Sequence, residues 1–204
     1  GDLYDFFLLD DETLFFSIGD VSGKGVPAAL FMAVSRILMK GTVRIDTDLS
    51  DALAKVNREL CVENEAMMFL TYFCATLNLR TGELRYTNAG HNPPLIKRAG
   101  GKPRWLPLPE GFLLGVLEDS TYRTETMFLN PGDTLFLYTD GVTEAMNVED
   151  QSFSDGNLQA LLENLGETEP ETMVREVIRH VQDFAGNAPQ SDDITALAIR
   201  YRGV

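Results

Sequence analysis

Short runs of apolar residues recur along the chain between polar turns. These stretches are rich in β-branched and aromatic residues and predict strands. Short polar turns between neighbouring strands predict hairpins, one across residues 10–13 and another across the Pro-Gly turn at 130–133. The strands are expected at residues 3–9, 14–18, 71–79, 83–88, 95–98, 122–129, 134–138 and 194–201.

A helical period replaces the strand pattern between residues 26 and 60. Residues 26–40 carry Pro27 in the first turn and Gly41 just past the end, the positions at which these residues start and stop helices. Asp48 or Ser50 can cap a second helix that reaches about residue 60. Two adjacent helices are therefore expected before the third strand.

Two more helices are expected in the last quarter of the chain. Residues 158–164 predict a short helix, and residues 171–184 predict a longer amphipathic one. Residues 103–115 contain three prolines and predict an irregular loop. Because the helices are inserted between strand hairpins and do not alternate with each strand, the pattern favours an α+β fold of packed sheets with helices outside.

Three acidic motifs lie where strands begin or end. Asp20 follows a strand and precedes a glycine-rich turn, Asp140 follows a strand and precedes Gly141, and Asp192-Asp193 open the last strand. Each Asp alone could simply organise a turn. Carboxylates that converge at one rim repel one another unless they are protonated, solvated or bound to cations, so the three motifs together favour a metal site.

The identity of the metal follows from the ligand types that the chain offers. Carboxylate oxygens are hard ligands and favour Mg²⁺ or Mn²⁺. Zinc is disfavoured because His91 and His180 are the only histidines and no Cys-His cluster is present. Cys61 and Cys74 have no metal-ligand spacing and are expected to be reduced, as in a cytosolic protein.

The chain is strongly acidic. Among 204 residues, 31 Asp and Glu outnumber 17 Lys and Arg, which gives a formal net charge of -14. Nucleic acid and anionic membranes attract clusters of cations, so neither is expected as a partner of this domain. No apolar run reaches the length of about 18 residues that a membrane span needs. With 44% apolar residues, the chain is expected to form one domain with one core.

The residues near Asp20 do not support a nucleophile or a nucleotide-binding loop. Ser22 has neither the Gly-x-Ser-x-Gly motif nor a placed histidine, and Lys24 lacks the glycine spacing of a P-loop. His91 lies in a Gly-Pro-rich turn between strands. It could act as a general acid for the leaving group, or form a hydrogen bond that fixes the turn.

Five short motifs follow one another over nearly the whole chain. They are GDLYDFF at residues 1–7, GDVSGKG at 19–25, NAGHNPP at 88–94, YTDGVTEA at 138–145 and SDDIT at 191–195. In this order they resemble the motifs of the SpoIIE/RsbU family, bacterial serine phosphatases of the metal-dependent type 2C (PPM) superfamily. Five motifs at fitting intervals are more specific than any one of them.

The resemblance implies an α-β-β-α sandwich of two antiparallel sheets flanked by helix pairs. Residues 1–204 would form a single PPM-type domain, expected to be the C-terminal output domain of a longer sensor protein. The family pattern has two glycines before its first acidic residue, and this chain starts at the second. The first strand of the family fold is therefore expected to be missing from the chain.

The resemblance also implies a site with two Mn²⁺ or Mg²⁺ ions. Asp20 would bridge both ions, and the backbone carbonyl of Val21 would hold one of them. Asp2 matches an acidic position that approaches a metal through water. Asp140 and Asp192 would hold the second ion, with Asp193 as the alternative to Asp192.

The implied reaction is hydrolysis of phosphoserine or phosphothreonine by water that the two metals activate, without a covalent intermediate. The expected substrate is a phosphorylated STAS-type regulator, an anti-anti-sigma factor in sigma-factor control. An upstream sensor domain in the same chain and a homodimer are further expected partners. The expected location is the cytoplasm, with membrane anchoring of the parent protein left open.

The alternative function is a non-catalytic module that sequesters its partner on a phosphatase fold. Retention of the mutually repelling carboxylates argues against this alternative.

Overall fold

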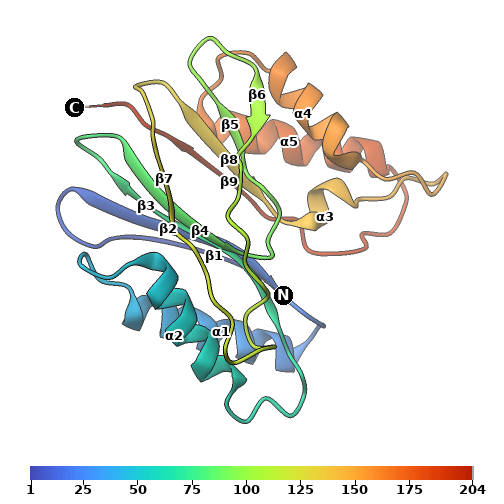
Figure 1. The fold of residues 1–204 in the computed structure, drawn as a ribbon. Helices are drawn as coiled ribbons and strands as arrows, with labels where there is room; N and C mark the ends of the chain where they lie inside the picture. The colour runs from blue at the N-terminus through green and yellow to red at the C-terminus, as the bar shows by residue number, and fades with distance from the viewer. Residues whose placement is uncertain (204) are drawn as a thin grey trace. The chain divides into compact units, whose positions relative to one another are not determined.

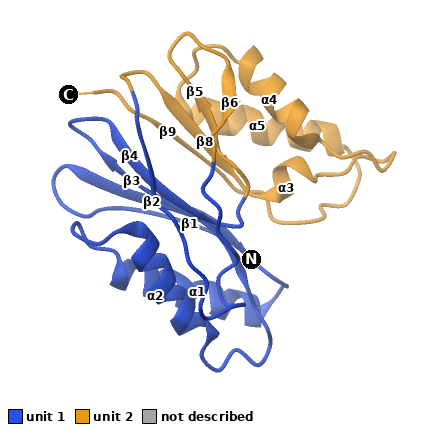
Figure 2. Cartoon of the chain, in the orientation of Figure 1, with its two compact units in different colours: residues 1–91, 108–129, 204 blue, residues 92–107, 130–203 orange. Residues whose placement is uncertain are grey.

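The computed structural model describes residues 1–203, which form two compact units. Unit 1 comprises residues 1–91 and 108–129, and unit 2 comprises residues 92–107 and 130–203 (Figure 2). Each unit contains one antiparallel sheet and its own helices (Figure 1). The predicted α+β class with two antiparallel sheets is confirmed.

Unit 1 is built on a five-stranded sheet in the order β1-β2-β3-β4-β7. Consecutive strands pair as antiparallel neighbours, and the hairpin predicted across residues 10–13 is confirmed. Residues on β2 alternate between the two faces of the sheet, so Phe15 and Val21 face the helices while Asp20 lies on the other face. The strands are β1 (Asp2–Leu8), β2 (Thr13–Val21), β3 (Leu70–Asn78), β4 (Glu83–Ala89) and β7 (Glu125–Phe128).

Two helices, α1 (Val26–Thr42) and α2 (Leu49–Cys61), cover one face of this sheet (Figure 1). Their buried side chains join those of the strands in one apolar core. Asp48 caps α2 as expected, because its Oδ1 accepts a hydrogen bond of 2.9 Å from the Ser50 N–H. Burial raises the pKa of Asp48, but hydrogen bonds from Thr124 and Ser50 outweigh it, and the net effect lowers the pKa.

A bidentate ion pair fastens α1 to the edge strand of unit 1. Arg36 donates from Nε to Asp5 Oδ2 at 2.9 Å and from Nη2 to Asp5 Oδ1 at 3.0 Å. Asp5 is 6% exposed, so its charge needs this partner. The pair ties the middle of α1 to the strand that carries Asp2.

Unit 2 contains a four-stranded sheet in the order β6-β5-β8-β9. Helix α5 packs against β9, and α4 packs against α5 and β6. The core of the unit lies between these helices and the sheet. Its elements are β5 (Leu95–Lys97), β6 (Pro103–Trp105), β8 (Thr134–Tyr138), α3 (Asp140–Thr143), α4 (Ser154–Asn164), α5 (Pro170–Ala185) and β9 (Ala196–Arg200).

The hairpin predicted across residues 130–133 is wrong. The tight turn does form, because the Asp133 N–H donates to the Asn130 carbonyl at 2.9 Å. However, β7 pairs with β4 in unit 1, whereas β8 pairs with β5 and β9 in unit 2. The chain therefore changes sheets at this turn, which a local sequence signal does not reveal.

Three smaller predictions also need correction. Gly41 lies inside α1, which ends where Val43 takes an extended conformation with ψ 128°. The loop predicted at residues 103–115 begins with a short strand, β6, paired with β5. Strand β2 extends through Asp20 to Val21, and β9 starts only at Ala196, so Asp192 and Asp193 lie in the loop before it.

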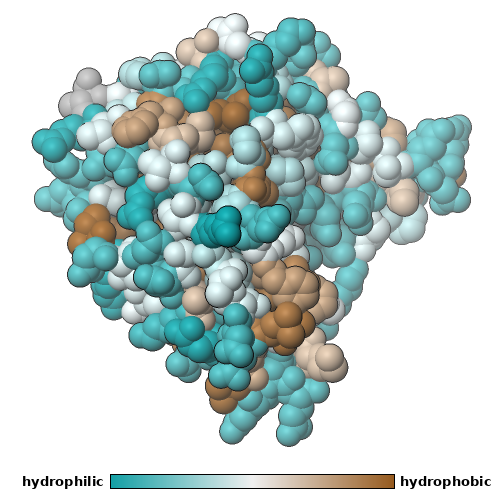
Figure 3. All heavy atoms as spheres, in the orientation of Figure 1, coloured by the Kyte–Doolittle hydropathy of each residue, from teal (hydrophilic) through white to brown (hydrophobic). Residues whose placement is uncertain are grey.

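The surface view is mainly polar (Figure 3), and the two cysteines are not paired with each other. Figure 3 shows a mainly polar face with scattered apolar patches. Cys61 and Cys74 are both free thiols, and burial raises the pKa of each. Over residues 1–203, none of the helices has the length and apolar character that crossing a bilayer requires.

Candidate functional site

Two acidic residues lie directly opposite each other at one end of the sheet in unit 1. Asp2 on β1 and Asp20 on β2 are register partners, so their side chains share a face of the sheet. The Asp20 side chain is 23% exposed, and its Oδ1 lies 3.8 Å from the nitrogen of Gly1. Like charges at directly opposed positions destabilise a sheet, so this pair is suited to a bound cation.

Glycine next to Asp20 permits the close contact between β2 and β3. A Cβ atom on Gly19 would lie 2.5 Å from the carbonyl oxygen of Thr71, closer than real side chains come. After the strand, the chain turns through Gly23 and Gly25, whose φ angles are 79° and 80°. These left-handed conformations favour glycine and allow the sharp turn from Asp20 into α1.

A hydrogen-bonded relay connects His91 to the backbone of Asp20. The Asp20 N–H donates to Thr71 Oγ1 at 3.3 Å, and Thr71 Oγ1 lies 2.8 Å from His91 Nδ1. His91 is 4% exposed, and its carbonyl accepts a hydrogen bond from the Asn88 amide at 3.2 Å. This arrangement favours the second role considered for His91, a hydrogen bond that fixes the local structure.

Asp140 occupies the first position of α3 in unit 2, directly after β8. The segment is held to the loop before β9 by hydrogen bonds between Thr139 and Thr195. The Thr139 N–H donates to the Thr195 carbonyl at 3.0 Å, and the Thr195 N–H donates to Thr139 Oγ1 at 3.1 Å. This pairing brings the loop that carries Asp192 and Asp193 next to the start of α3.

The backbones of these two segments also approach closely at Gly141. A Cβ atom on Gly141 would lie 1.9 Å from the Asp193 carbonyl oxygen, so no side chain fits there. Asp192 is half-buried and accepts at Oδ1 from the Asp193 N–H at 2.9 Å, whereas Asp193 is exposed. The Gln190 amide donates to the Asp192 carbonyl at 2.7 Å. Unit 2 thus places the backbone at the start of α3, directly after Asp140, against the loop of Asp192-Asp193.

The four carboxylates predicted to approach metals are divided between the units. Asp2 and Asp20 belong to unit 1, and Asp140 and Asp192 belong to unit 2. Within residues 1–203, His, Cys, Asp and Glu side chains form no group of three or more that could hold a metal. Convergence of all four residues therefore stays a prediction. Their chemistry fits hard divalent cations, because every proposed side-chain ligand is a carboxylate.

Thr71 and Gly141 are positioning residues whose contacts the sequence patterns do not reveal. Thr71 is an ordinary strand residue by its pattern, and only the pairing of Asp20 with Thr71 places it beside the site. The signal that could have identified Gly141 is its position directly after Asp140, because an Asp-Gly pair after a strand indicates close backbone packing.

Comparison with known proteins agrees with the order of these motifs. The sequence model of the family described as Stage II sporulation protein E (SpoIIE) matches residues 10–202. The chain belongs to the SpoIIE family. The resemblance drawn from the five motifs is thereby confirmed.

Two curated relatives of this SpoIIE-family chain align with nearly all of it. It is 31% identical over 233 residues to Protein IcfG of Synechocystis sp., covering 99% of the chain and 36% of the relative. It is 30% identical over 205 residues to Phosphoserine phosphatase RsbU of Bacillus subtilis, covering 99% of the chain and 59% of the relative. The chain thus spans only part of the length of both relatives.

Solved structures confirm the fold of the SpoIIE-family domain. The RsbU and RsbW domains of Rv1364c from Mycobacterium tuberculosis match with a TM-score of 0.83 at 26% identity, over 99% of this chain and 55% of that one. RsbX, solved in complex with magnesium, matches with a TM-score of 0.67 at 19% identity, over 97% of this chain and 85% of that one.

Replacing Gly141 with alanine is expected to displace the loop of Asp192-Asp193. Because the added methyl group overlaps the Asp193 carbonyl, Gly141→Ala should lower the free energy of unfolding by about 1–3 kcal/mol. Urea unfolding measures this change. The matched control is Gly156→Ala in α4, where the nearest atom to an added Cβ is 3.9 Å away. Equal stability of the two variants would contradict the close contact.

Proposed function

We propose that this chain is a metal-dependent phosphatase domain that hydrolyses phosphoserine or phosphothreonine on a regulatory protein. The observation that carries the proposal is the direct opposition of Asp2 and Asp20 at the end of the β1–β2 pair. At a sheet edge with a purely structural role, two opposed carboxylates would only destabilise the sheet. The name of the relative RsbU, a phosphoserine phosphatase, supports the reaction class.

In this proposal the acidic residues of both units hold two Mn²⁺ or Mg²⁺ ions. Asp20 would bridge the ions and the Val21 carbonyl would hold one of them, with Asp2 acting through water. Asp140 and Asp192 would hold the second ion, and Asp193 remains the alternative. Bound divalent cations supply Lewis acidity, which lowers the pKa of water to near neutrality and offsets charge on the phosphoryl oxygens.

The remaining residues of the site position these ligands. Thr71 accepts the Asp20 N–H, and His91 holds the Thr71 hydroxyl in place. Gly141 allows the Asp192-Asp193 loop to lie against the start of α3. None of these residues needs to touch the substrate. The role of general acid for His91 is the weaker proposal, because the imidazole is buried.

The substrate that we propose is a phosphorylated STAS-type regulator in sigma-factor control. In the same proposal, residues 1–204 act as one cytoplasmic output domain under an upstream sensor domain. A homodimer would be one way for the sensor to act. Helix α1 offers a surface for such contacts, because it exposes a row of apolar side chains at helical spacing, namely Val26, Leu30, Val34 and Ile37.

Hydrolysis of p-nitrophenyl phosphate by the purified chain tests the reaction. We expect turnover with Mn²⁺ or Mg²⁺, none with a chelator, and a loss of at least about 100-fold in Asp20→Asn, since even residues that only support metal ligands change activity by 10–100-fold. Asp11→Asn, an equal change of charge at an exposed position in the turn after β1, is the matched control and should keep full activity.

Two results would contradict the proposal. Turnover that persists in chelator would exclude the metal-dependent mechanism. Binding of a phosphorylated STAS-type protein without hydrolysis of it or of the small ester, with Mn²⁺ present, would favour the sequestering module.

The relay from His91 to Asp20 is tested by Thr71→Val. This change keeps the shape of the side chain but removes the hydroxyl that accepts the Asp20 N–H, so the affinity for Mn²⁺ should fall about tenfold. Isothermal titration calorimetry measures the affinity. Thr76→Val, on the same strand and also half-buried, is the control. If both variants bind Mn²⁺ as tightly as the parent chain, the relay does not position Asp20.

A further inference from the structure

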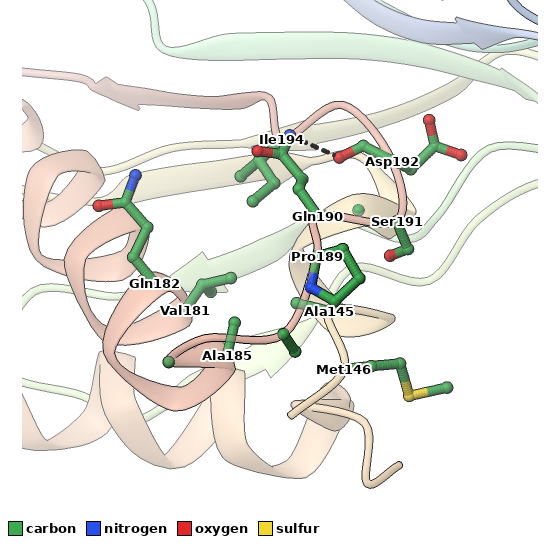
Figure 4. A pocket seen from close by; sticks show the side chains of 13 residues that line it. Ala145, Met146, Val181, Gln182, Ala185, Pro189, Gln190, Ser191, Asp192 and Ile194 are labelled. Carbon is green, nitrogen blue, oxygen red and sulfur yellow. Dashed lines mark hydrogen bonds between the residues drawn. The ribbon is translucent and has the colours of Figure 1, made fainter. Parts of the chain in front are cut away.

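A cavity of about 190 Å³ lies within unit 2, between the end of α5 and the loop that follows it. Val181 and Ala145 are buried and are part of its lining. Figure 4 shows Val181 and Ala185 of α5 at one end of the cavity and Ser191 and Asp192 at the other. The cavity therefore runs from the helix to the loop that carries the proposed metal ligand.

Apolar residues outnumber polar ones in the lining of the cavity. Its thirteen residues include no Lys, Arg or His, and Asp192 is the only charged residue among them. A phosphate or an acidic side chain would find no cation in this lining. Cavities of about 150 Å³ with apolar walls bind benzene, so the volume suits one branched aliphatic or aromatic side chain.

The position of the cavity connects it with the proposed reaction. Gly141, which follows Asp140, and Asp192 both line it. Each residue of an extended peptide advances the chain by at most about 3.6 Å. A side chain that enters the cavity from a substrate held at these carboxylates therefore belongs to a residue close in sequence to the phosphoserine.

We propose that this cavity, which we name the Val181 pocket, binds an apolar side chain of the substrate protein within about two residues of the phosphoserine. The proposal rests on the phosphatase function proposed above and adds a determinant of substrate choice to it. An apolar side chain is favoured over water there because it exchanges exposed for buried apolar surface. The exposed amide of Gln182 can bind the peptide backbone, and so can the amide oxygen of Gln190, whose nitrogen donates to the Asp192 carbonyl.

Pairs of synthetic phosphoserine peptides test the proposal. The two members of a pair differ only by Leu or Ser at one position, from two residues before the phosphoserine to two after it. The ratio of their kcat/KM values with Mn²⁺ is the readout. At one position, Leu should be favoured by about tenfold, the discrimination that a small apolar pocket provides.

Variants that fill or strip the pocket should remove this preference. Ala188→Phe places a ring in the cavity, and Met146→Ser removes an apolar wall and serves if the first variant does not fold. In either variant the Leu-to-Ser ratio should fall to within twofold of one. The matched control is Ala160→Phe, at an exposed position of α4 outside the lining, and it should keep the ratio of the parent chain.

The outcomes separate this proposal from the one on which it rests. If both peptides are hydrolysed equally, or if Lys at the same position is favoured over Leu, the chain is a phosphatase but the pocket does not select apolar residues. A preference that Ala188→Phe and Met146→Ser both leave intact also overturns the pocket. If neither the peptides nor p-nitrophenyl phosphate is hydrolysed, the phosphatase function fails and the pocket proposal fails with it.

Discussion

Electrostatic repulsion between neighbouring carboxylates is the constraint on which the site depends. Asp2 and Asp20 are opposed on adjacent strands of unit 1, while Asp140 lies near the Asp192-Asp193 loop of unit 2. Such placements are unfavourable in a chain that already carries a formal net charge of -14. A bound divalent cation would remove this repulsion, and the relief would add to its binding free energy. The acidic pairs therefore favour metal-dependent chemistry.

Close backbone contacts at two glycines, where no side chain intervenes, hold these acidic residues in place. Gly19 lets β2 approach β3, and Gly141 lets the start of α3 approach the loop before β9. In both cases the acidic residue is next to the glycine, so the close approach holds the backbone that carries it. Thr71 and His91, which lie outside the glycine-rich motif, add hydrogen bonds that hold the backbone of Asp20.

The sequence predicts local elements and chemistry better than it predicts pairing. Hydrophobic period and turn residues identify most strands and helices, and the motifs single out Asp20, Asp140 and Asp192 as the proposed ligands. The error at residues 130–133 has a physical cause, since the turn is local but the choice of β4 for β7 is decided by distant residues. Likewise, Thr71 carries no signal of its own and becomes significant only through register.

The central proposal is that acidic residues of both units hold one pair of cations. The most direct test is the electron paramagnetic resonance spectrum of the chain with two equivalents of Mn²⁺. The account predicts a spin-coupled Mn²⁺ pair whose coupling is lost in both Asp20→Asn and Asp140→Asn. A spectrum of two uncoupled ions, one removed by each variant, would contradict it.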